Sequence, residues 1–122
     1  MTDKELAREI RKQRRLEKLG TNNPRCGTCG ECRWQAIEQH HVSGQKCDAD
    51  TTVLSCRNCH RVLSDDQIDH PALDPTADEL LQRIGHFLLG LADLLRIVIE
   101  KLTEFGLALI DRAALETGEA QP

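Results

Sequence analysis

The sequence predicts an α+β protein in which a small metal-bound unit lies between a short basic helix and a long C-terminal helix. Three observations lead to this fold class. Two C-x-x-C pairs enclose the middle of the chain, aromatic residues are almost absent, and most Leu, Ile and Val residues follow position 79. A first half this poor in apolar side chains needs a stabiliser besides a hydrophobic core. The cysteines meet that need.

Residues 1–20 are predicted to form the basic helix. Thr2 and Glu5 have the spacing of a capping box, in which each side chain accepts a hydrogen bond from the backbone of the other residue. Gly20 can adopt the left-handed conformation that commonly ends a helix. The segment therefore has both a start signal and a stop signal.

The charge of the chain is divided unevenly. Residues 1–64 carry twelve Lys or Arg against eight Asp or Glu, whereas residues 65–122 carry four against twelve. The predicted N-terminal helix alone has seven basic and four acidic residues. Two interpretations of this helix stay open: a solvated helix whose charges have no ligand, and an arm whose Arg14 and Arg15 contact nucleic-acid phosphates.

The two C-x-x-C pairs have the spacing of a zinc site. Their cysteines are Cys26, Cys29, Cys56 and Cys59, with 26 residues between the pairs. Each pair presents two thiolates from one tight turn, and two pairs complete a tetrahedron around structural Zn²⁺. The charged N-terminus lacks the apolar segment of a secretory signal, so we expect a cytoplasmic chain without disulfides. Cys32 and Cys47 are expected to be free thiols.

Two segments around these cysteines resemble a known family. Residues 38–42 read EQHHV, and residues 53–63 read VLSCRNCHRVL. Together they resemble the HNH endonucleases, also called ββα-metal or His-Me finger nucleases, in the form stabilised by zinc through two C-x-x-C pairs. The resemblance implies a nuclease-like domain at residues 21–72, with a β-hairpin packed on a helix.

The resemblance also implies catalytic roles for three histidines. His41 would act as the general base, while His40 and His60 would hold a catalytic divalent ion, Mg²⁺ or another. The chemistry agrees, because a neutral imidazole with a free pKa of about 6.5 can take a proton from water at physiological pH. Arg57 and Arg61 flank the predicted helix start, where phosphate oxygens are expected to bind.

The chain departs from the family pattern at one position. The family's central Asn lies a few residues before the second C-x-x-C pair and orients the base. This chain has Asp50-Thr51-Thr52 there. Whether Asp50, Thr51 or Thr52 replaces the Asn in positioning His41 stays open.

Residues 76–117 are predicted to form a helical segment. Thr76 and Glu79 repeat the capping-box spacing. An unbroken 4-3 apolar repeat, typical of a coiled coil, is formed by Leu81, Ile84, Leu88, Leu91, Leu95, Val98, Leu102, Phe105 and Leu109. We expect homo-oligomerisation through residues 76–116. The alternative is two shorter helices folded back at Gly90 or Gly106.

The sequence therefore predicts an enzyme: a metal-dependent endonuclease that hydrolyses phosphodiester bonds in DNA. The alternative is a catalytically silent zinc-finger module that binds nucleic acid or acts as an adaptor, and oligomerises through its tail. The His doublet favours the nuclease, whereas the missing Asn and the long tail favour the adaptor. No membrane span is expected, because the longest uncharged stretch of the tail is far shorter than about 20 residues. His70 and His86, outside the motif, are expected to be surface residues.

Overall fold

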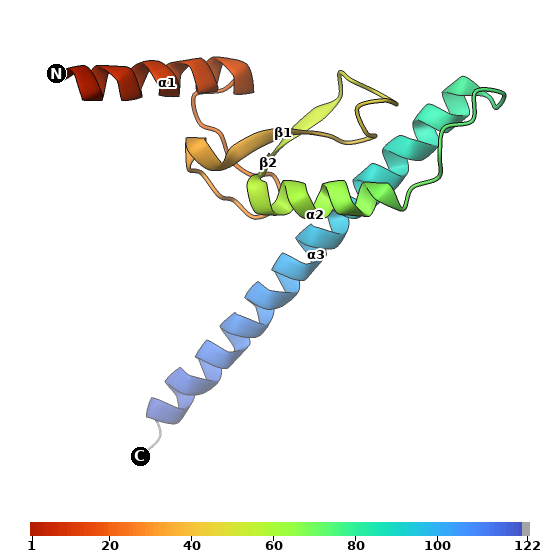
Figure 1. Ribbon diagram of the computed structural model, residues 1–122. Helices are drawn as coiled ribbons and strands as arrows, with labels where there is room; N and C mark the ends of the chain where they lie inside the picture. The colour runs from red at the N-terminus through yellow and green to blue at the C-terminus, as the bar shows by residue number, and fades with distance from the viewer. Residues whose placement is uncertain (121–122) are drawn as a thin grey trace.

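The computed structural model describes residues 1–120, and the side chains of residues 1–116. Along the chain lie helix α1 (Asp3–Leu19), a 3-10 turn η1 (Trp34–Ala36), strands β1 (Ile37–His41) and β2 (Thr52–Cys56), and helices α2 (Arg57–Ile68) and α3 (Glu79–Ala120). The two strands form an antiparallel sheet beside α2, and α3 crosses behind this unit (Figure 1). The predicted α+β class is confirmed.

Helix α1 is capped as the sequence predicts. The Thr2 hydroxyl accepts a hydrogen bond from the Glu5 amide at 3.1 Å, and the Glu5 carboxylate accepts one from the Thr2 amide at 2.9 Å. Gly20 ends the helix with φ of 76°. Only Leu16 and Leu19 of this helix are buried, so α1 is anchored by its C-terminal end.

The hairpin and α2 share a small core without aromatic residues. In the β1–β2 register, Ile37 pairs with Cys56 and His41 pairs with Thr52. Strand β2 leads directly into α2, whose Leu63 is fully buried, as is Ile37. The rest of the core is made of the buried side chains of Leu19, Cys26, Cys56, Cys59 and Ile97. Since three of the seven residues in this core are cysteines, its stability depends on what the cysteines bind.

Helix α3 runs unbroken from Glu79 to Ala120, so the expected alternative of a hairpin at Gly90 or Gly106 is wrong. Gly90 has another role. A Cβ atom at this position would lie 1.7 Å from the Val42 carbonyl oxygen. The glycine is therefore needed where the helix backbone packs against the end of the β-hairpin, and it does not turn the chain.

The start of α3 also differs from the prediction. The Asp78 carboxylate accepts a hydrogen bond from the Leu81 amide at 2.8 Å, which is an N-cap contact. The Thr76 hydroxyl instead donates to Asp74 at 2.7 Å. The Thr76–Glu79 capping box is therefore wrong, because the nearer Asp78 satisfies the helix end.

Among the described side chains, the buried positions of helix α3 lie on one face. Gly90, Asp93 and Ile97 are buried on that face. The 4-3 apolar stripe lies on other faces, and Leu95 and Leu102 keep 50% and 66% of their surface exposed. No helix among residues 1–120 is both long and apolar enough to cross a bilayer.

A buried hydrogen bond joins α3 to the residues that follow α2. His70 Nε2 lies 2.7 Å from Asp93 Oδ2, and Arg96 Nη1 lies 2.6 Å from Asp93 Oδ1. The side chain of His70 is only 11% exposed. The interpretation of His70 as a surface residue is therefore wrong, and its ring lies 6.3 Å from that of the half-buried His86.

Candidate functional site

The four cysteines of the C-x-x-C pairs come together. The sulfur atoms of Cys26, Cys29, Cys56 and Cys59 all lie within 4.8 Å of one another, and three of these residues are buried. The Cys29 and Cys56 sulfur atoms are 3.6 Å apart. A tetrahedral zinc ion with Zn–S bonds of about 2.3 Å requires sulfur separations of about 3.8 Å. The cluster is thus placed to hold a structural metal ion, and its dimensions fit zinc.

Backbone hydrogen bonds bring the two pairs to one place. The Gly27 amide donates to the Leu54 carbonyl at 2.9 Å, which holds the first pair against β2. The second pair lies at the junction of β2 and α2, where Cys56 is the N-cap residue and its sulfur accepts from the Cys59 amide at 3.4 Å. A helix N-terminus favours negative charge, so this position suits a thiolate ligand.

The thiols of the cluster differ in acidity. Burial raises the pKa of Cys59 to about 12. Burial also acts on Cys26, but hydrogen bonds from the Thr28 hydroxyl and from backbone amides outweigh it and lower the pKa to about 6. A metal ion takes all four cysteines as thiolates, so its binding releases the proton that Cys59 otherwise holds.

The adjacent histidines of β1 occupy different environments, as strand alternation predicts. His40 is 1% exposed, its Nε2 lies 3.4 Å from the Gln67 side-chain nitrogen, and its ring centre lies 5.3 Å from that of His60. Burial lowers the pKa of His40 to about 4, and the His60 and His41 rings add to this shift. His40 is therefore neutral at physiological pH. His41, by contrast, is partly exposed to solvent.

His60, in the first turn of α2, is held by a carboxylate that the motif did not point to. His60 Nδ1 lies 2.6 Å from Glu38 Oε2, and Arg57 Nε lies 3.2 Å from Glu38 Oε1. Hydrogen bonds from His60 and then Arg57 lower the pKa of Glu38. With Nδ1–H donated to Glu38, the Nε2 lone pair of His60 is left for a ligand.

The two histidines His41 and His60 open onto one cleft of about 300 Å³. The residues that line this cleft are Arg15, Lys18, Leu19, Glu38, Gln39, His41 and His60. Of the four arginines predicted to contact phosphate, Arg15 lines the cleft and Arg57 lies beside it, paired with Glu38. Arg14 and Arg61 are exposed and do not line it.

The three candidates at the missing Asn position have different surroundings. The Thr51 hydroxyl donates to Asp48 at 2.6 Å, so it holds the loop rather than His41. Asp50 is exposed and donates its backbone amide to the same aspartate. Thr52 is the cross-strand partner of His41. Thr52 is thus the candidate that pairs with His41 in the sheet.

An amide side chain from α2 fixes the backbone of the predicted base. Gln67 Nε2 donates to the His41 carbonyl at 2.7 Å and reaches the Val42 carbonyl at 3.3 Å. Sequence reasoning missed Gln67, and no local signal was available, because 26 residues separate it from His41. The sequence pointed only weakly to Glu38 as a site residue, through its position two residues before His40 on the same strand.

A second metal site is less complete than the cysteine site. Within the described part of the chain, the cysteines are the one set of three or more ligand atoms found close together. His40 is nearly inaccessible and faces Gln67, so His60 is the better placed imidazole. The two imidazoles, with Glu38 holding the ring of His60, are donors that a divalent ion accepts, but other oxygens such as those of solvent would have to complete its coordination. The buried Ser55 hydroxyl, opposite Glu38 in the ladder, has no hydrogen-bond partner among the described residues.

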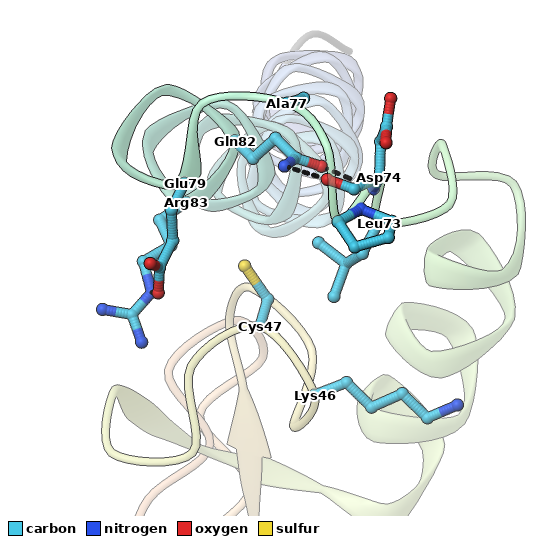
Figure 2. Close-up of a pocket in the computed structure, with 9 residues that line it drawn as sticks. Lys46, Cys47, Leu73, Asp74, Ala77, Glu79, Gln82 and Arg83 are labelled. Carbon is cyan, nitrogen blue, oxygen red and sulfur yellow. Dashed lines mark hydrogen bonds and ion pairs between the residues drawn. The ribbon is translucent and has the colours of Figure 1, made fainter.

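A hollow of about 470 Å³ lies away from these groups (Figure 2). It is bounded by the loop after β1 and by the start of α3, and the Cys47 sulfur points toward it. The Gln82 amide exchanges two hydrogen bonds with the backbone of Asp74, at 2.7 and 2.8 Å. None of the residues that line the hollow belongs to the motif, so the hollow is not part of the candidate site.

Comparisons with known protein families, with curated proteins and with solved structures give no match for this chain. The likeness to the HNH nucleases therefore stays a prediction from the motif.

Proposed function

We propose that this chain is a zinc-stabilised, metal-dependent endonuclease of the HNH type that hydrolyses phosphodiester bonds in DNA. One observation supports the proposal above all others: a single cleft is lined by His41, His60 and two cations of α1, Arg15 and Lys18. A proton acceptor, a metal-ligating imidazole and partners for a phosphate thus surround one space.

The roles of the cleft residues follow from the demands of phosphodiester hydrolysis. The phosphate is negative and repels nucleophiles, so Arg15 and Lys18 would attract it and offset its charge. His41 would take the proton from the attacking water. A Mg²⁺ or similar ion held by His60 and His40 supplies, when bound, neutralisation of the charge that develops on the phosphoryl group.

The structural metal in this proposal is Zn²⁺ on the four cysteines. Four thiolates in a tetrahedral arrangement are the usual ligand set for zinc or for iron–sulfur chemistry. Because Cys26, Cys56 and Cys59 belong to the small core, the zinc would hold together the hairpin and α2, and with them the two cleft histidines.

We further propose that α3 associates with a second copy of the chain. With 3.6 residues per turn, the positions of residues 80–113 that face away from the hairpin and α2 carry no charged side chain. Exposed on that side are Leu81, Ile84, Leu88, Leu95, Ile99, Leu102, Phe105 and Leu109. Such a stripe exposes several hundred Å², roughly as much as the largest patch of a typical monomer or more. A copy of the same helix offers a matching apolar surface.

One observation favours the alternative of a catalytically silent binding or adaptor module. The Thr51 hydroxyl is engaged by Asp48, and the His41 ring has no hydrogen-bond partner among the described side chains. A base whose ring is not held in place is a weaker catalyst than one that a neighbour orients.

Nicking of supercoiled plasmid by the purified zinc-loaded protein separates these alternatives. We expect nicked product when Mg²⁺, Mn²⁺ or Ni²⁺ is added, and none without a second divalent ion. DNA binding without nicking in any of the three metals would reject the nuclease and support the silent module.

A further inference from the structure

Five cations of α1 lie on one face of the helix. They recur with spacings of four and three residues and are Lys4, Arg8, Arg11, Arg15 and Lys18. With 3.6 residues per turn, these positions fall within an arc of about 80°. We call this row the basic stripe. The glutamates Glu5, Glu9 and Glu17 lie outside the arc, so the charges of α1 are segregated by face.

The stripe leads into the cleft that holds His41. Its last two members, Arg15 and Lys18, line that cleft. The Arg15 guanidinium donates to the Ile37 carbonyl, and the Gln39 amide donates to the Lys18 carbonyl at 3.1 Å, so β1 fixes this end of α1. The other three cations lie on the part of α1 that extends away from the sheet (Figure 1). From Lys4 to Lys18 the stripe spans about 21 Å.

The arrangement is costly for an isolated helix. Like charges three or four residues apart repel, and each such pair destabilises a helix by about 0.2–0.5 kcal/mol. The stripe contains four consecutive pairs of this kind. None of its members forms an ion pair among the side chains that the structure describes. A polyanion lying along the helix would remove this repulsion.

We infer that the basic stripe is a binding track for the sugar–phosphate backbone of DNA, which it guides into the His41 cleft. The destination of the strand rests on the proposed function, whereas the track itself rests on the row of cations. Since the contacts are to phosphates, they are independent of base sequence and weaken as salt rises. DNA is favoured over an anionic membrane because the stripe ends among cleft histidines, and α1 exposes two large apolar side chains, those of Leu6 and Ile10.

The test is DNA affinity in a variant that removes the three outer cations, Lys4→Gln, Arg8→Gln and Arg11→Gln. These residues are exposed, and Gln is a good helix former, so the fold should be kept. The control removes three cations of α3 instead, Arg83→Gln, Lys101→Gln and Arg112→Gln, with the same change in net charge. Circular dichroism and zinc content verify both proteins.

Binding of a short fluorescent duplex is measured by anisotropy between about 50 and 200 mM salt, without a second divalent ion. Each phosphate contact contributes about 0.9 to the slope of log affinity against log salt. In the α1 variant we expect the magnitude of this slope to fall by about two to three, and the affinity at about 100 mM salt to fall at least tenfold. The α3 control should match the wild type in both.

Equal slopes for wild type and the α1 variant would overturn the track, as would an equal loss in the α3 control. Binding of the wild type to phosphatidylserine vesicles but not to the duplex would also overturn it, in favour of a membrane surface. The binding track and the proposed nuclease activity can be rejected independently of each other. Loss of duplex binding in the α1 variant supports the track even if the wild type nicks no plasmid. If the wild type nicks plasmid and the α1 variant binds the duplex as tightly as the wild type, the track is rejected and the nuclease is kept.

Discussion

At the scale of single residues, the environment of each histidine decides the chemistry it can perform. His40 is buried and kept neutral, whereas His41 lines the cleft and is open to solvent. His60 is oriented by Glu38, which leaves one ring nitrogen available. The strand alternation of the His doublet was predictable from the sequence. The Glu38–His60 contact was not, because 22 residues separate the two and only the packing of β1 against α2 joins them.

Glu38 is expected to act as a positioning residue for the second metal ion. In the variant Glu38→Gln, His60 loses its charged partner, and loss of such a partner typically costs about 10- to 100-fold in metal affinity. We expect the Mn²⁺ concentration for half-maximal nicking to rise by about that factor, with the rate at saturating Mn²⁺ nearly retained.

The matched control is Glu31→Gln, which removes a glutamate that pairs with the exposed Arg33. Its Mn²⁺ dependence should equal that of the wild type. A Glu38→Gln protein with an unchanged Mn²⁺ midpoint would show that the carboxylate has no part in metal binding.

At the scale of elements, a single residue has three roles at the junction of β2 and α2. Cys56 ends the strand, caps the helix and belongs to the cysteine cluster. The cysteine pairs were predictable from their own spacing, whereas the hairpin and α2 were expected only from the resemblance carried by residues 38–42 and 53–63. The start of α3 was mispredicted, since Thr76 and Asp78 are both good caps and the spacing alone did not choose between them.

The variant Cys56→Ser is expected to lose the zinc ion and to unfold the hairpin and α2, because metal binding and folding are one equilibrium in so small a unit. Wild type should contain one zinc per chain. The control Cys32→Ser, an exposed cysteine outside the cluster, should keep both its zinc and its melting temperature. Zinc analysis and thermal unfolding provide the readouts. A Cys56→Ser protein that melts like the wild type would contradict the structural role.

At the scale of the whole molecule, α3 presents two faces with different tasks. One face packs on the hairpin and α2 through Gly90, Asp93 and Ile97, and the other carries the exposed apolar stripe. The 4-3 repeat predicted the stripe. It did not predict the buried face, whose glycine and aspartate are not recognisable as core residues until Val42 and His70 are seen beside them.

Charges placed in the stripe should separate the copies. The double variant Leu95→Lys, Leu102→Lys puts two cations in the middle of the apolar surface, where they would be buried without partners. Light scattering should give the wild type a mass of at least twice the 13.7 kDa of one chain, and the variant the mass of one chain. Glu100→Lys with Glu104→Lys, on the polar side, is the control and should stay associated. A monomeric wild type at micromolar concentration would contradict self-association.

The assignment of His41 as general base is the central claim, and one comparison tests it most directly. The nicking rate of His41→Ala is measured beside that of the wild type and of His86→Ala, which removes an imidazole outside the cleft. Loss of a general base costs about 100- to 10,000-fold in rate. We predict a loss in this range for His41→Ala, with zinc content and DNA affinity retained, and no loss for His86→Ala. Wild-type nicking rates in the His41→Ala protein would contradict the account.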